Sequence, residues 1–259
     1  MYRAPVRFLA LCALVPALAV SAAPTKTKLT VAAAANLTSV AADLEAAFRA
    51  VHSDIDLEFV FGASGALTTQ IQNGAPFHVF MAADTGFPER IVKAGLAAGD
   101  WKVYARGKLV LLSVKPREFS RGLGILPGSA IERIAIANPE TAPYGKAAVQ
   151  ALRAAGIWDA VKDRIVTAQN IAQAVQYVLT AADFGFVNKS ALYTKDLAAY
   201  IDKEGVNWME IDSSTHEPID QAYVVLKIAQ GDPAAAAFAA FLTSEAARGV
   251  FLSAGYAVP

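Results

Sequence analysis

Residues Leu29 to Pro76 read LTVAAAANLTSVAADLEAAFRAVHSDIDLEFVFGASGALTTQIQNGAP. This segment repeats one pattern twice: a short apolar strand, a tight polar turn and a helix. The first unit has its strand at Leu29–Ala35, followed by apolar residues at helical spacing from Leu37 to Phe48. The second unit has its strand at Ile55–Phe61 and a helix that begins near Ala66. Two such units in succession predict an α/β architecture.

The turns of these units carry short polar side chains where the helices begin. Asn36 and Thr38 are both suited to cap the first helix, and Ser64 is suited to cap the second. A helix N-terminus has unpaired N–H groups and the positive end of the helix dipole, so that two of them converging form a site for a small anion. Later strand-to-helix junctions carry similar side chains, at Tyr144 and Asn170. This repetition favours a ligand-binding role.

The charge balance limits how an anion could be held. Lys plus Arg and Asp plus Glu number 23 each, so the chain has no net charge at neutral pH. A chain without a strong overall field is not steered to nucleic acid or acidic lipid, and we expect neither as a partner. Any anion that it binds must therefore be held by local dipoles.

The first 22 residues have the composition of a secretory signal peptide. Arg3 and Arg7 precede an apolar segment, Phe8–Val20, that is too short to span a bilayer, and small residues predict cleavage after Ala22. Cys12, the only cysteine, lies inside this segment rather than at its end, which argues against a lipid anchor. The mature chain would then have no cysteine, no disulfide and no membrane span, which suits the periplasm.

The rest of the chain continues to alternate strands with helices. Further strands are predicted at Phe77–Ala83, Lys108–Val114, Ile131–Ala137, Ile165–Thr167, Phe184–Val187, Trp208–Ile211 and Ala222–Ile228. Further helices are predicted at Phe87–Ala94 (capped by Asp84 and Thr85), Lys146–Ala155, Ile171–Ala181 and Pro233–Ala247, with a tail helix near Arg248–Leu252. We expect mostly parallel sheets flanked by helices in two lobes, residues 23–106 with 221–259 and residues 107–220. In open α/β sheets a ligand lies beyond the carboxyl ends of the strands, so we expect it in the cleft between the lobes.

Two other interpretations of Ser64 stay open at this point. The turn Gly62-Ala63-Ser64-Gly65-Ala66 resembles the nucleophile elbow of serine hydrolases, but Ala66 stands where that motif requires glycine. A hydrolase also needs a histidine base, and His216, beside Glu217, is the one whose place in the chain would suit that role. The second alternative is a plain helix cap. No metal site is predicted, because the three histidines are far apart and no cluster of histidines or carboxylates has ligand spacing.

Four segments carry a resemblance to a known family. They are AAANLT (Ala33–Thr38), VFGASGAL (Val60–Leu67), NPETAPYG (Asn138–Gly145) and GFVNKSAL (Gly185–Leu192). In these segments, and over essentially the whole mature chain, the sequence resembles the molybdate-binding periplasmic components of ABC transporters. The resemblance implies a two-lobed, type II periplasmic binding protein that is not an enzyme and needs no cofactor. It also implies a monomer that holds molybdate or tungstate as a tetrahedral oxyanion, without a metal cation, and docks transiently with an inner-membrane ABC permease.

The resemblance also implies which residues bind the oxyanion. They are Asn36, Ala35, Ser64, Ala63, Tyr144 and Ile171. By this resemblance Asn36 contributes a side-chain and a backbone donor, Tyr144 donates from a loop, and Ile171 donates its backbone N–H. Many family members have tyrosine where Asn188 stands, and the resemblance leaves open whether Asn188 contacts the ligand.

The chemistry of the ligand agrees with these residue types. Molybdate at neutral pH is a dianion without a proton, so a matching site offers donors only, and Asn, Ser, Tyr and backbone N–H groups can all donate. Phosphate retains a proton and would need a carboxylate acceptor, and no acidic residue stands at the contact positions of these turns. A sulfate-binding or phosphate-binding protein of the same fold remains an alternative, distinguished by cavity size and acceptor content.

Overall fold

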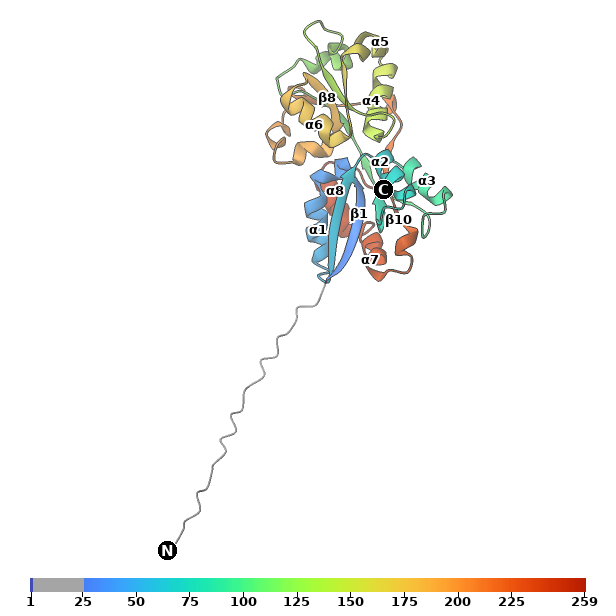
Figure 1. Cartoon of the computed structure of the whole chain (residues 1–259). Helices are drawn as coiled ribbons and strands as arrows, with labels where there is room; N and C mark the ends of the chain where they lie inside the picture. The colour runs from blue at the N-terminus through green and yellow to red at the C-terminus, as the bar shows by residue number, and fades with distance from the viewer. Residues whose placement is uncertain (2–25) are drawn as a thin grey trace.

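The computed structural model describes Met1 and residues 26–259. The predicted signal peptide therefore lies outside the described residues, apart from Met1, and so does Cys12. The described chain forms two five-stranded sheets, each flanked by helices, one above the other in Figure 1. This architecture confirms the two-lobed α/β fold predicted from the sequence.

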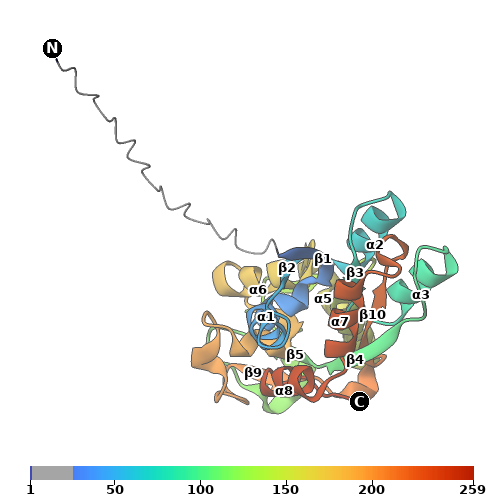
Figure 2. The ribbon, with the colours of Figure 1, turned by 90° about the horizontal axis from the view of Figure 1, so that it is seen from below.

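The first sheet has the strand order β2-β1-β3-β10-β4. Its strands are β1 (Thr27–Ala34), β2 (Ile55–Gly62), β3 (Val79–Met81), β4 (Lys102–Gly107) and β10 (Ile219–Val225). Helices α1 (Ala41–Arg49), α7 (Pro233–Phe241) and α8 (Glu245–Ser253) cover one face of this sheet, and α2 (Ser64–Gln72) and α3 (Gly86–Lys93) cover the other (Figure 2). Aromatic residues of α1, α7 and α8, among them Phe48, Phe238 and Phe251, fill the core on the first face.

The second sheet has the strand order β7-β6-β8-β5-β9. Its strands are β5 (Leu109–Leu112), β6 (Ile134–Ala137), β7 (Ile165–Ala168), β8 (Phe184–Asn188) and β9 (Trp208–Glu210). Helices α4 (Pro143–Ala154) and α5 (Trp158–Val161) pack on one face, and α6 (Ile171–Thr180) packs mainly on the other. Short 3₁₀ turns complete the chain: η1 (Ala35–Ser39), η2 (Phe119–Ile125), η3 (Lys162–Arg164), η4 (Lys189–Tyr193), η5 (Ala198–Tyr200), η6 (Ser213–Thr215) and η7 (Lys227–Ala229).

The strands of each sheet are mostly parallel, as the sequence predicts, but one strand in each sheet runs in the opposite direction, which the sequence did not indicate. β1 pairs in parallel with β2 and β3, whereas β10 pairs antiparallel with β3 and β4. In the second sheet β6 is parallel to β7 and β8, whereas β5 is antiparallel to β8 and β9. The cause is the path of the chain. β5 and β10 each begin where the chain enters a sheet from the other one, so each runs away from the junction that its neighbours approach.

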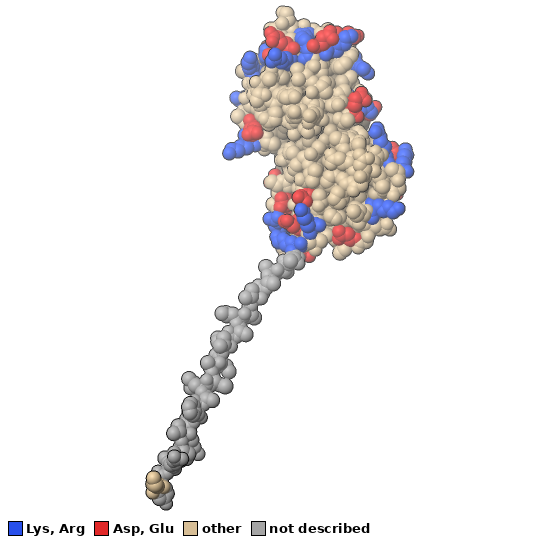
Figure 3. Space-filling view, in the orientation of Figure 1, with Lys and Arg blue, Asp and Glu red and all other residues tan. Residues whose placement is uncertain are grey.

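The strands of the first sheet come from residues 27–107 and 219–225, and those of the second from residues 109–210. We propose lobe boundaries close to those given above: 106/107 falls one residue before the end of β4 and 220/221 falls two residues into β10, so the strands favour crossings near residue 108 and between residues 210 and 219. On the face shown in Figure 3, acidic and basic side chains are intermixed toward the two ends, and the middle of the molecule is mostly uncharged.

Some predicted helix boundaries were wrong. The helix expected over Pro233–Ala247 ends at Phe241, and Ser244 begins α8 by accepting a hydrogen bond from Ala247 N at 3.3 Å. The expected tail helix is therefore the second half of α8. No single helix among residues 26–259 is long and apolar enough to cross a membrane; α7 and α8 reach that threshold only as a pair, which is bent by 55°.

Candidate functional site

A small pocket lies where the two lobes meet. The space inside it is about 10 Å³, close to what one water molecule needs and far below the roughly 300–1,000 Å³ of pockets for drug-sized ligands. All six residues predicted to bind a ligand line it: Ala35, Asn36, Ala63, Ser64, Tyr144 and Ile171. Helices α2, α4 and α6 and the turn η1 all begin at this pocket, because the chain passes from a strand into each of them there.

Ser64 is the first residue of α2 and is buried, with 1% of its surface exposed. Its Oγ accepts a hydrogen bond from Ala83 N at 3.0 Å and makes no capping bond to its own helix. The plain helix-cap interpretation of Ser64 was therefore wrong. In the described part of the chain no acceptor takes the hydroxyl proton, so this group retains a donor beside the pocket.

Tyr144 lies in the first turn of α4 rather than in the preceding loop, because α4 begins at Pro143, three residues earlier than predicted. Proline suits this position, since its fixed φ fits the first helical turn and its missing N–H is not needed there. The Tyr144 hydroxyl oxygen accepts a hydrogen bond from Gln221 Nε2 at 3.0 Å. Burial raises the pKa of the Tyr144 phenol well above its ordinary value, so the hydroxyl stays protonated.

Asn36 is buried, and its side-chain donor is already occupied. Nδ2 donates to Gln221 Oε1 and to the hydroxyl of Tyr256, both at 2.9 Å, which uses both amide hydrogens. Oδ1 is buried without a hydrogen-bond partner among the described residues. The structure thus differs from the expectation that the Asn36 side chain is free to donate. It also differs from the expectation of an Asn36 or Thr38 cap, because neither η1 nor α1 has a side-chain capping bond.

Two further asparagines have structural partners. Asn170 caps α6, since its Oδ1 accepts from Gln173 N at 3.0 Å, and this places the N–H of Ile171 in the first turn of that helix. Asn188 does not line the pocket. Its Nδ2 donates to Ser190 Oγ at 2.7 Å and lies 3.4 Å from the backbone oxygen of Asn36.

The lobes contact each other around the pocket. Gly65 N in α2 donates to the backbone oxygen of Thr141, on the second lobe, at 2.9 Å. Ser190 Oγ in η4 donates to the hydroxyl of Tyr256, in the C-terminal tail that packs on the first sheet, at 2.9 Å. The pocket is therefore bordered by both lobes in a closed arrangement.

The pocket lining has donors but no charged side chain. None of its residues is Asp, Glu, Lys, Arg or His. Its hydroxyls, on Ser64 and Tyr144, each accept a protein N–H bond and each retain a proton. Together with the N–H groups of the helix starts, they form a surface suited to an anion that only accepts hydrogen bonds.

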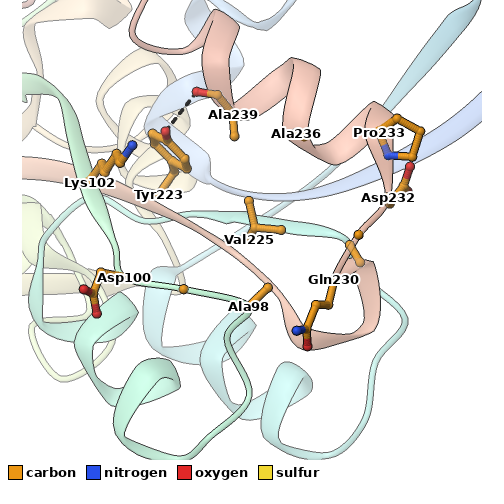
Figure 4. A pocket seen from close by; sticks show the side chains of 13 residues that line it. Ala98, Asp100, Lys102, Tyr223, Val225, Gln230, Asp232, Pro233, Ala236 and Ala239 are labelled. Atoms are coloured by element: carbon orange, nitrogen blue, oxygen red, sulfur yellow. Dashed lines mark hydrogen bonds between the residues drawn. The ribbon is translucent and has the colours of Figure 1, made fainter.

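The hydrolase arrangement is not seen at Ser64. No histidine lines this pocket, and within residues 26–259 none bonds to Ser64; His216 Nδ1 lies 2.7 Å from the backbone oxygen of Glu217. The same residues contain no group of three or more His, Cys, Asp or Glu side chains that could hold a metal ion. A larger groove on the first lobe, beside Lys102, Tyr223 and Pro233, includes none of the predicted site residues (Figure 4).

Comparisons with known proteins place the chain in a family. A family described as bacterial extracellular solute-binding protein matches residues 29–257. The chain is 40% identical over 230 residues to the molybdate-binding protein ModA of Azotobacter vinelandii, covering 87% of this chain and 88% of that one. It is 36% identical over 229 residues to ModA of Rhodobacter capsulatus, covering 87% and 86%.

Solved structures show the same fold. The periplasmic molybdate-binding protein of Azotobacter vinelandii superposes with a TM-score of 0.81 at 33% sequence identity, covering 89% of this chain and 99% of that one. The sulfate-binding protein SubI of Mycobacterium tuberculosis superposes with a TM-score of 0.70 at 18% identity, covering 89% and 86%. At that identity the second likeness concerns the fold alone.

Proposed function

The chain belongs to the family of bacterial extracellular solute-binding proteins, and from this premise we propose that it is a periplasmic protein that binds molybdate between its lobes and delivers it to an ABC transporter. Tungstate, an oxyanion of the same shape and charge, is proposed as a second ligand. We propose that the protein is a monomer and has no enzymatic role. We also propose that it docks with a permease in the inner membrane.

The observation that carries this proposal is the donor chemistry of the pocket. Ser64 on the first lobe and Tyr144 on the second each offer a proton while their oxygens accept protein N–H bonds. No carboxylate lines the pocket to accept a proton from a ligand such as hydrogen phosphate. Molybdate has no proton to give, so the two hydroxyl donors suit it.

We propose the six predicted residues as the ligand site, with one change of role. Ser64 and Tyr144 would donate through their hydroxyls, and Ile171 through its backbone N–H. Asn36 would donate through its backbone N–H alone, because both side-chain hydrogens are already used. Ala35 and Ala63 have small side chains that let the anion approach the backbone. Each hydrogen bond to a charged group contributes about 1.5 to 3 kcal/mol, so a few of them give micromolar or tighter binding.

Thermal unfolding with added oxyanions tests the proposed function. Molybdate or tungstate at about a thousand times its dissociation constant should raise the free energy of unfolding by about 4 kcal/mol. For a protein of this size this corresponds to roughly 10 °C in the unfolding midpoint. Sulfate and phosphate at equal concentration are the controls. A shift with sulfate or phosphate alone would keep the fold and change the cargo, and no shift with any of the four would contradict the proposal.

Ser64→Ala is expected to weaken molybdate binding by about tenfold or more, because it removes one hydrogen bond to a charged ligand. Isothermal titration calorimetry would measure the change. Ser253→Ala is the matched control, since this exposed serine donates only to Val250 O at the end of α8. Equal affinity of the Ser64→Ala variant and the wild type would show that the Ser64 hydroxyl does not contact the ligand.

A further inference from the structure

Gln221 is a buried polar residue that the proposed function does not explain. It lies in β10, close to where the chain returns from the second sheet, and none of its surface is exposed. It is paired with Ala105 of β4 at an irregularity of the ladder, where Ala222 pairs with Val103 and Tyr104 is left as an extra residue. A glutamine in the middle of an apolar strand must find hydrogen-bond partners inside the protein.

The Gln221 carboxamide finds three partners, two of which line the pocket. Its Oε1 accepts from Asn36 Nδ2 and lies equally close, at 2.9 Å, to the hydroxyl of Tyr104, which donates to it. Its Nε2 donates to the hydroxyl of Tyr144 at 3.0 Å. Asn36 belongs to the first lobe and Tyr144 to the second, so one side chain connects residues of both lobes at the ligand pocket.

The bond from Nε2 also determines what the Tyr144 hydroxyl can do. A phenol has a single proton to donate. Because its oxygen accepts from Gln221, and no other described side chain or backbone group bonds to it, the proton has no partner within the described chain. The raised pKa keeps that proton in place. Ser64 has the same arrangement with a different donor, the N–H of Ala83.

The backbone at the end of β4, two residues beyond the partner of Gln221, makes room for this contact. A Cβ atom on Gly107, the last residue of β4, would overlap the Tyr144 hydroxyl and would lie 2.7 Å from Gln221 Nε2. The Tyr144 hydroxyl therefore reaches the backbone of the first sheet at a position where only glycine fits. This close approach shows that the contact between Gln221 and Tyr144 is part of the packed interior and not a contact at the surface.

We propose that Gln221 is a positioning residue that turns the Tyr144 hydroxyl into an obligate donor toward the ligand and connects it to Asn36. This inference rests on the proposed function, since it concerns the same ligand. Gln221 does not line the pocket and acts through Tyr144. A residue that fills this role must provide both an acceptor and a donor, as a carboxamide does.

A double-mutant cycle tests whether Gln221 acts through Tyr144. Molybdate affinity would be measured by calorimetry for the wild type, Gln221→Leu, Tyr144→Phe and the double variant. Each single change is expected to weaken binding by about tenfold. The double variant should bind molybdate only about threefold less tightly than whichever single variant binds it less tightly. The reason is that the second change removes an interaction that the first has already disabled. Additive losses of about a hundredfold would overturn the inference.

Two further variants separate positioning from folding. Gln221→Glu keeps the acceptor for Asn36 and Tyr104 but loses the donor to Tyr144, and it should also weaken binding by about tenfold or more. Unchanged affinity in that variant would overturn the inference even if Gln221→Leu failed to fold. Tyr223→Phe is the matched control, because the Tyr223 hydroxyl, on the same strand, donates to Ala239 O at 2.9 Å (Figure 4) and Tyr223 does not line the ligand pocket. Its affinity should equal that of the wild type.

The cycle also separates this inference from the proposed function. A wild-type protein that binds neither molybdate nor tungstate would contradict the function itself. A wild-type protein that binds molybdate, with losses that simply add between Gln221 and Tyr144, would contradict only the positioning role.

Discussion

Asn36→Asp should reduce the affinity for molybdate by about a hundredfold or more near pH 8. The two side chains have the same shape, but the variant places a carboxylate at the edge of a pocket that holds a dianion. Two unit charges 4 Å apart interact by about 4 kcal/mol near a protein surface, and each 1.4 kcal/mol is a factor of about ten in affinity. The variant also loses the Nδ2 donor that bonds Gln221 and Tyr256, so the positions of both partners are less fixed.

The loss should shrink as the pH falls. Burial raises the pKa of the introduced carboxyl group above its ordinary value of about 3.9, and the bound dianion raises it further, since both disfavour the charged form. The variant therefore takes up a proton on binding, and its affinity should increase from about pH 8 to about pH 6. In the wild type, Tyr144 is the one titratable residue among those that line the pocket, and its raised pKa keeps it protonated. Wild-type affinity should therefore stay constant over this range.

Asn73→Asp provides the control for this experiment. It makes the same replacement at an exposed position at the end of α2, where water screens the added charge. Its affinity for molybdate should stay within about twofold of the wild type, because an exposed charge contributes little to the free energy of an interaction. If Asn36→Asp bound molybdate as tightly as this control near pH 8, the anion would not lie beside Asn36.

The strand-turn-helix units could be predicted from the sequence because their signals are local. The apolar run that ends at Asn36 and the turn at Ser64 lie at the ends of β1 and β2. Of the two residues predicted to cap α3, Asp84 accepts a hydrogen bond from Phe87 N at 3.0 Å, whereas Thr85 makes no side-chain capping bond. β4 was missed, because Lys102 and Arg106 make it look like a solvated loop. The reversed direction of β5 and β10 could not be predicted either, since it depends on how the chain crosses between the lobes.

The site shows the same division between local and distant signals. Its six predicted residues each stand where a strand passes into a helix, which a sequence pattern can mark. No local pattern marks the partner that holds Asn36 and Tyr144 in place, because Gln221 is 185 residues from Asn36 and 77 from Tyr144 in the sequence. One signal was present, since Gln221 interrupts the apolar strand IDQAYVV and a buried amide requires partners. The identity of those partners depends on tertiary structure alone.

Gly145→Ala is expected to lower the free energy of unfolding by about 3 kcal/mol, the upper part of the usual range for overpacking. Gly145 lies in the first turn of α4, directly against the end of β6. A Cβ atom there would overlap the backbone oxygen of Ala137 and lie 2.7 Å from its carbonyl carbon. Backbone atoms cannot rotate away as a side chain can, so α4 must shift outward. Tyr144, the preceding residue, would move with it, and molybdate affinity should fall by about tenfold or more.

Chemical denaturation without ligand would measure the stability change, and calorimetry the change in affinity. Gly249→Ala in α8 is the matched control, because a Cβ atom at that position meets nothing within 4 Å. There the added methyl group only improves helix propensity, so the control should be unchanged or up to about 1 kcal/mol more stable, with wild-type affinity. The two substitutions are chemically identical, so a large difference between them must come from the contact of α4 with β6. If both variants were as stable as the wild type, α4 could shift without cost, and its first turn would not fix the position of Tyr144.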